Sequence, residues 1–198
     1  GYTYLDTGAM YRAVAYHLHI KGIQASDVNA IAAELETISI ELHPAENGDV
    51  PVTLNGEAVG DRLRTPEISM LASRVSALPP VREKLTLMQQ QIGDKGRVVA
   101  EGRDTGTVVF PDAAYKFYLD ATPVERASRR ADQLRRRGEI VDERKLLEMT
   151  VIRDKNDSER EIAPLTKADD ATYIDTTGID ADQVLEMLLS EIAKKNTP

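Results

Sequence analysis

The sequence contains no cysteine, no tryptophan and only three histidines. Without cysteine the chain cannot form disulfides, thiolate metal sites or a cysteine nucleophile. Three scattered histidines leave little for a histidine-rich metal site, so we predict no metal ligands and expect His17 and His19 to be surface or packing residues. No apolar run approaches the ~18 residues of a membrane span, and the first four residues are not the basic start of a signal peptide. We therefore expect a cytoplasmic protein with no membrane partner.

Length and charge limit the domain count and the partners. The 198 residues, of which 41% are apolar, are enough for one domain with a real core. The net charge of −8 argues against general nucleic-acid binding, which needs a basic surface. We expect a monomer with no nucleic-acid partner.

Helical and strand patterns alternate along the chain, which predicts an α/β fold with a parallel sheet covered by helices on both faces. Strands are expected at Tyr2–Leu5, at Val98–Ala100 as a short, fully buried strand, at Tyr115–Leu119 and at Thr172–Ile174. Capping residues and prolines predict helices that start after Thr7, near Ser26 or Asp27, at Thr65-Pro66, at Pro80, at Thr122-Pro123, at Asp142 and at Asp180. Between Ile38 and Gly60 two alternating segments and an Asn55-Gly56 turn predict a small antiparallel insert.

Two short motifs, about ninety residues apart, fall where strands give way to loops: Leu5 to Arg12, and Glu101 to Pro111. Each carries glycine, a hydroxyl or carboxylate, and an arginine. In an open α/β sheet such junctions form the crevice that binds a small ligand. Charged residues directly after a buried strand, as in Gly102-Arg103-Asp104, are either a satisfied ion pair or ligand contacts.

The expected helix from Pro123 to Gly138 concentrates arginine in an acidic chain. For Arg126, Arg129 and Arg130 two interpretations stay open: a site for a ligand with several phosphates, or a solvated face with Glu125 and Asp132 as ion-pair partners. For the three arginines at 135–137 we favour the solvated face.

Arg153, Asp157 and Arg160 are spaced so that a continuous helix places all three on one face. Two arginines beside one aspartate suit a ligand with a phosphate and a ribose hydroxyl. A surface ion pair is the alternative, kept open by Glu159 and Glu161.

Together these motifs resemble bacterial cytidylate kinases, P-loop nucleoside monophosphate kinases, and the resemblance runs nearly the length of the chain. It rests on the two junction motifs, on the R-x-x-x-D-x-x-R spacing followed by Ala163-Pro164-Leu165, and on the antiparallel insert. It implies a kinase-like parallel sheet flanked by helices, with the insert at 38–60 in the monophosphate-binding part. It also implies a helical lid with flanking helices at about 122–163, all within one domain, 1–198. The alternative interpretation is that the insert is a surface insertion with no role in binding.

The resemblance also implies roles for single residues in phosphoryl transfer from ATP, with Mg²⁺, to CMP or dCMP. Asp104, Ser73 and Arg82 would recognise cytosine. Arg12 and Arg103 would hold the monophosphate, in a pocket lined by Thr7, with Tyr11 near the sugar. Arg153 and Arg160 would meet phosphate and Asp157 a ribose hydroxyl; Arg103, Arg153 and Arg160 would be catalytic. Arg126, Arg129 and Arg130 would contact ATP.

One element of the family pattern is missing: no G-x-x-x-x-G-K-S/T motif occurs in the sequence. We therefore expect that the chain lacks an N-terminal strand, loop and helix of the family, and that residues 1–198 alone are inactive. Two alternatives are a cytidine-nucleotide-binding module that never used ATP, and the kinase domain of a larger fusion enzyme.

Overall fold

The computed structural model describes residues 1–43 and 51–195, and the chain divides into two compact units. Unit 1 comprises Gly1–Phe110 and Asn156–Thr166, and unit 2 comprises Pro111–Lys155 and Lys167–Pro198. Each unit is described by itself.

Unit 1 contains a pair of parallel strands. Strand β1, Thr3–Asp6, pairs with β5, Val98–Glu101, so that the ends of the two strands lie next to each other. Helix α1, Thr7–Ile20, follows β1 without a loop, because Asp6 caps the helix by accepting a hydrogen bond from the Ala9 amide. The inner face of α1 is almost fully buried in the core of unit 1.

Three further helices complete the core of unit 1. They are α2 (Val28–Leu35), α3 (Pro66–Val75) and α4 (Pro79–Gly93). The side chains of Asp27 and Thr65 cap α2 and α3, which confirms these predicted starts. Helix α4 begins one residue before its expected proline, because Leu78 is extended and two prolines follow it. α1 contacts α3, and α2 contacts α4.

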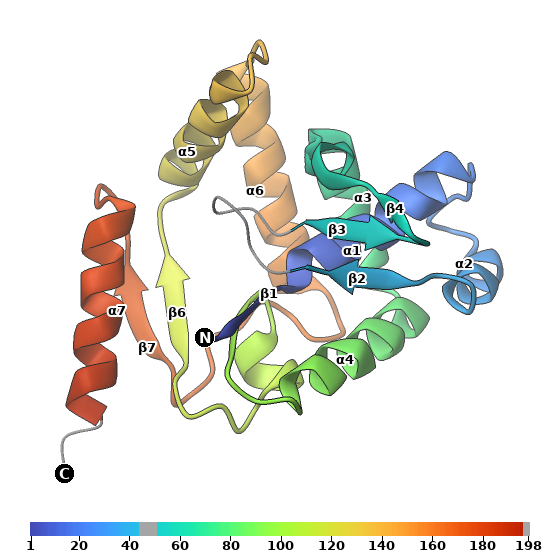
Figure 1. The fold of residues 1–198 in the computed structure, drawn as a ribbon. Helices are drawn as coiled ribbons and strands as arrows, with labels where there is room; N and C mark the ends of the chain where they lie inside the picture. The colour runs from blue at the N-terminus through green and yellow to red at the C-terminus, as the bar shows by residue number, and fades with distance from the viewer. Residues whose placement is uncertain (44–50, 196–198) are drawn as a thin grey trace. The chain divides into compact units, whose positions relative to one another are not determined.

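The predicted insert is present as a three-stranded antiparallel sheet against α1 (Figure 1). Its strands are β2 (Ile40–Leu42), β3 (Val52–Leu54) and β4 (Glu57–Ala58), followed by the short 3₁₀ helix η1 (Gly60–Arg64). Asn55 and Gly56 both have positive φ, at 51° and 80°, as a tight hairpin turn requires. Residues 44–50 of the predicted 38–60 insert lie outside the described residues.

Strand β5 is not fully buried, and the prediction on this point was wrong. Val99 is 54% exposed, and Val98 and Ala100 are half-buried. Among the described residues β5 pairs with β1 alone, so it is not covered as the interior strand of a wide sheet would be. After β5 the chain makes a single π-helical turn, η2, Thr105–Val109.

Unit 2 contains a second pair of parallel strands, β6 (Phe117–Asp120) and β7 (Thr172–Asp175). Its helices are α5 (Pro123–Arg136), the long helix α6 (Glu143–Glu159), whose last turn belongs to unit 1, and α7 (Ala181–Lys195). The predicted caps are present: Thr122 accepts from the Glu125 amide, and Asp180 and Gln183 exchange hydrogen bonds. In the described part of the chain no helix has the length and apolarity to cross a membrane.

Two parallel strand pairs with flanking helices and an antiparallel insert confirm the predicted fold class. One helix differs from expectation: α6 ends at Glu159, so Arg160 follows the helix instead of continuing it. The backbone turns there, with Ala163 at a φ of 48°, and the Arg160 side chain bonds to the Ala163 carbonyl.

The core of unit 1 can be tested with two leucines on one helix. Leu85 is fully buried on α4, whereas Leu87, two residues later, is 55% exposed. We expect Leu85→Ala to lower the free energy of unfolding by about 2–5 kcal/mol. Leu87→Ala should change it by about 0.5 kcal/mol or less. Urea unfolding followed by circular dichroism is the measurement, and equal midpoints for the two variants would contradict the described packing.

Candidate functional site

The two sequence motifs meet at the ends of β1 and β5. Asp6 pairs in register with Glu101, and the Thr7 hydroxyl donates to the Glu101 carbonyl at 2.6 Å. Gly102 permits this close approach, because a Cβ there would lie 2.3 Å from the Thr7 Oγ1. The first helical turn of α1 is thus held against the loop that carries Arg103 and Asp104.

Arg12 lies against the start of α1. Its Nη2 donates to the Asp6 Oδ2 at 2.8 Å, while the other Asp6 oxygen caps the helix. The Arg12 Nε is buried and has no hydrogen-bond partner among the described residues. A Cβ on Gly8 would lie 3.0 Å from the Arg12 Nη1, so glycine leaves room for the guanidinium.

Asp104 is a buried carboxylate between two arginines. It is 4% exposed; Arg82 from α4 donates to its Oδ2, and the Arg160 Nη2 lies 3.8 Å from its Oδ1. Arg82 also donates to the Ser76 carbonyl at 3.0 Å. The Arg82 guanidinium lies over the Tyr11 ring, 5.7 Å from its centroid. Burial raises the pKa of the Tyr11 hydroxyl, although the charge of Arg82 opposes the shift.

Asp157 is the second buried carboxylate, 3% exposed. The Ser73 hydroxyl from α3 donates to its Oδ1 at 2.8 Å, and the Arg103 Nε donates to its Oδ2 at 3.0 Å. The Leu165 amide donates to the Asp157 carbonyl at 2.7 Å, which folds the following residues back onto the last turn of α6. Asp157 therefore joins α3, the loop after β5 and residues 156–166.

These residues form a cluster with an excess of positive charge. Three guanidiniums, those of Arg82, Arg103 and Arg160, face the two carboxylates of Asp104 and Asp157, which leaves one net positive charge. Burial lowers the pKa of Arg160, and the nearby charge of Arg82 lowers it further. The Arg160 Nη2 is buried without a hydrogen-bond partner in the described chain. An anionic ligand would balance the excess positive charge and accept a hydrogen bond from this nitrogen.

The structure gathers nine of the candidate residues in unit 1. They are Thr7, Tyr11, Arg12, Ser73, Arg82, Arg103, Asp104, Asp157 and Arg160. The other four lie in unit 2: Arg153 on α6, and Arg126, Arg129 and Arg130 on α5.

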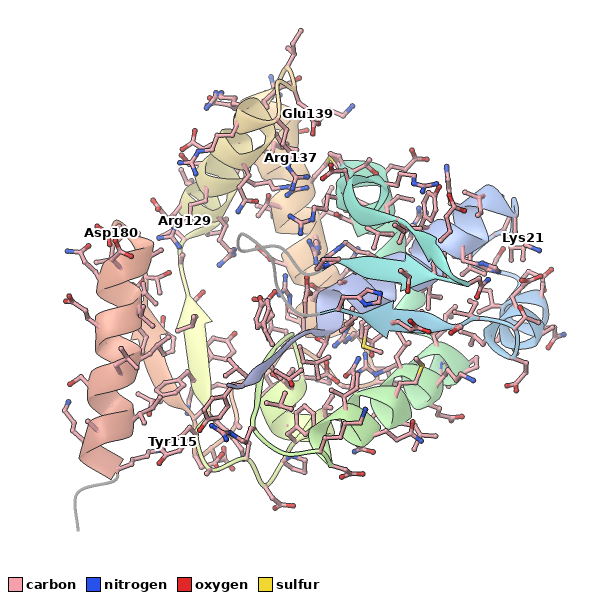
Figure 2. All side chains as sticks on the ribbon, viewed as in Figure 1. Lys21, Tyr115, Arg129, Arg137, Glu139 and Asp180 are labelled. Atoms are coloured by element: carbon pink, nitrogen blue, oxygen red, sulfur yellow. The ribbon has the colours of Figure 1, made fainter. Side chains whose placement is uncertain are left out.

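The arginines of α5 bind protein acceptors within unit 2. Arg126 contacts Asp120 at 3.2 Å and also pairs with Asp154. Arg129 donates to Glu125 at 2.9 Å and to the Thr176 hydroxyl at 3.0 Å. It also donates to the Ile179 carbonyl, next to Asp180 at the start of α7; Figure 2 labels Arg129 and Asp180. For Arg126 and Arg129 these contacts support the ion-pair interpretation that the sequence left open.

Sequence reasoning missed two members of the site. Asp6, which caps α1, was not among the candidate site residues, yet it also binds Arg12. Ser76 was not singled out, although its hydroxyl accepts from the Arg160 Nη1 at 3.0 Å. Its place at the end of α3, within the same short segment as Ser73 and Arg82, was the available signal.

Comparison with known proteins gives one consistent result. The cytidylate kinase family matches residues 1–194. A cytidylate kinase of Syntrophotalea carbinolica is 46% identical over 197 residues, which cover 98% of this chain and 82% of that protein. A cytidylate kinase of Carboxydothermus hydrogenoformans is 44% identical over 195 residues, covering 98% of this chain and 87% of that protein.

A longer relative is also similar. The bifunctional pantoate ligase/cytidylate kinase of a Synechococcus strain is 47% identical over 189 residues, or 95% of this chain. The chain spans only 39% of the length of that protein.

The buried cluster makes a prediction about stability. Asp104→Asn would leave both Arg82 and Arg160 without their carboxylate, whereas Arg82→Met would leave Arg160 close to Asp104. Removing one partner of a buried ion pair costs about 3–5 kcal/mol. We expect the free energy of unfolding to fall by an amount near the upper end of this range in Asp104→Asn and near the lower end in Arg82→Met. Urea unfolding checks the order, and a larger loss for Arg82→Met would contradict the shared carboxylate.

Proposed function

The chain belongs to the cytidylate kinase family, and from that membership we propose that it transfers the γ-phosphoryl group of ATP to CMP or dCMP. The products are ADP and CDP or dCDP. The observation that carries the proposal is the cluster of Asp104 and Asp157 with three arginines, which offers both carboxylate acceptors and an excess of positive charge. The family match over residues 1–194 supports one kinase domain that includes both units.

Cytosine recognition is assigned to Asp104, with Ser73 and Arg82. An ionised carboxylate only accepts hydrogen bonds, and cytosine offers a donor at N4 where uracil offers an acceptor. Arg82 fixes the Oδ2 of Asp104, and the remaining lone pairs of the carboxylate are the acceptors for N4.

Sugar and phosphate are assigned to the other half of the cluster. Asp157 would accept from a ribose hydroxyl, with Tyr11 near the sugar. Arg103 and Arg160 would bind the monophosphate, since Arg103 is 41% exposed and the buried Arg160 Nη2 has no hydrogen-bond partner among the described residues. Arg12, whose Nε has no hydrogen-bond partner within residues 1–43 and 51–195, would add a further contact with the phosphate where Thr7 lines the pocket.

The proposed chemistry needs no protein nucleophile. The second pKa of a phosphate monoester is near 6, so the acceptor is largely dianionic at neutral pH. The work of the protein is then to hold two phosphates in line and to stabilise the charge of the transferring group. Arg103 and Arg160 are suited to this by charge and position, and Arg153 is assigned to the same role from the family pattern.

The ATP side of the proposal rests on the family alone. Arg126, Arg129 and Arg130 are proposed to contact ATP, and they would first have to exchange their protein acceptors. Mg²⁺ is proposed to enter with ATP. In residues 1–43 and 51–195 no three His, Asp or Glu side chains gather to hold a metal ion, so we assign no protein ligand to Mg²⁺. We place the activity in pyrimidine nucleotide metabolism, in a cytoplasmic monomer.

The bifunctional relatives favour one alternative arrangement, in which this kinase is joined to a pantoate ligase. The proposed kinase chemistry is the same in both arrangements. The mass of the natural polypeptide distinguishes them.

The kinase assay tests the function directly. With the natural polypeptide that carries this chain, we expect ADP formation from ATP to depend on CMP or dCMP and to be much slower with UMP. CMP binding without ADP formation would instead indicate a binding module. Failure to bind CMP would refute both the kinase and the binding module.

Specificity is expected to depend on Asp104. We predict that Asp104→Ala weakens CMP binding by about 1–3 kcal/mol, the scale of a hydrogen bond to a charged group, and narrows the gap between CMP and UMP. Asp112→Ala, at an exposed aspartate in unit 2, is the control and should leave both affinities unchanged. Calorimetric titration with both nucleotides is the measurement. An unchanged ratio of the two affinities would remove Asp104 from the base site.

A further inference from the structure

Ser76 holds two of the buried arginines with two different oxygens. It ends α3 and is 5% exposed. Its backbone carbonyl accepts from the Arg82 Nη1 at 3.0 Å, and its hydroxyl accepts from the Arg160 Nη1 at the same distance. The hydroxyl in turn donates to the Ser73 carbonyl at 2.8 Å, which fixes its lone pairs toward Arg160.

The bond from Ser76 determines how the Arg160 guanidinium is turned. Its Nε donates to the Ala163 carbonyl at 2.7 Å and its Nη1 to Ser76. A planar guanidinium fixed at two of its three nitrogens has one remaining direction for the third. That third nitrogen, Nη2, is buried, has no hydrogen-bond partner in the described part of the chain, and lies 3.8 Å from Asp104.

We infer that Ser76 is a positioning residue, whose hydroxyl orients Arg160 so that Nη2 is presented to the phosphate of the bound nucleotide. This inference rests on the proposed function for the identity of the ligand. The two oxygens of Ser76 have different partners. The carbonyl accepts from Arg82, which is assigned to the base site, and the hydroxyl accepts from Arg160, which is assigned to the phosphate. Removing the hydroxyl therefore deletes the contact with Arg160 and leaves the contact between Arg82 and the Ser76 carbonyl in place.

Ser76→Ala is the direct test, because it deletes the hydroxyl and keeps the carbonyl. The net value of one hydrogen bond corresponds to about a three- to tenfold change in affinity. We expect the Kd for CMP and the Kd for UMP to rise together by about this factor, with their ratio unchanged. Ser76→Thr, which keeps a hydroxyl, should restore most of the affinity. A change in the ratio of the two Kd values would overturn this assignment of the Ser76 hydroxyl to the phosphate contact.

Two controls separate positioning from a general loss of structure. Thr37→Ala removes the same type of hydroxyl-to-carbonyl bond, from Thr37 to Glu34 at the end of α2, and should leave CMP binding unchanged. In an Arg160→Ala background, Ser76→Ala should have no further effect on the Kd for CMP, because Ser76 acts through Arg160. Additive effects of the two substitutions would refute the inference.

A readout without nucleotide keeps this test separate from the proposed function. In ¹⁵N spectra of the free protein, the Arg160 Nε–H signal should be sharp in the wild type and in Ser76→Thr, and broadened in Ser76→Ala. An unchanged signal in Ser76→Ala would refute the role of the hydroxyl. A wild-type protein that binds no CMP would refute the proposed function, and the Nε–H signal would still decide whether Ser76 orients Arg160.

Discussion

The burial of two carboxylates, Asp104 and Asp157, within unit 1 constrains the rest of the site. A buried carboxylate is costly unless charged or polar donors surround it, and here those donors come from four segments of the chain. Arg82 and Ser73 come from α4 and α3, Arg103 from the loop after β5, and Arg160 from residues 156–166. The same bonds that satisfy the carboxylates therefore hold these segments together and leave one positive charge in excess.

The local structure of the chain was largely readable from the sequence. Caps such as Asp27, Thr65 and Thr122, and the Asn55-Gly56 turn, determine helix starts and the hairpin through contacts within a few residues, so pattern reasoning found them. Burial was harder to predict. The run Val98–Ala100 has the composition of an interior strand, yet Val99 is exposed, because burial depends on neighbouring elements and not on the run itself.

The candidate site was likewise predictable from the sequence only in part. Family motifs named nine residues that the fold brings into one unit, although some lie more than eighty positions apart, as Ser73 and Asp157 do. The partners within the cluster were not predictable, since the spacing of Asp157 and Arg160 suggests a helical pair while the chain turns after Glu159. Ser76 was not identified for a related reason. Its contact with Arg160 joins residues that are distant in the sequence, and the sequence alone does not place them together.

The arginines of this cluster are proposed to bind a nucleoside monophosphate. Titration with CMP, followed through the ¹⁵N signals of the arginine Nε groups, tests it most directly. The account predicts saturable shifts at Arg82, Arg103 and Arg160, and none at Arg135, which pairs with Asp132 and Glu143 on the surface. Shifts confined to the α5 arginines, or no saturable shift in the cluster, would contradict it.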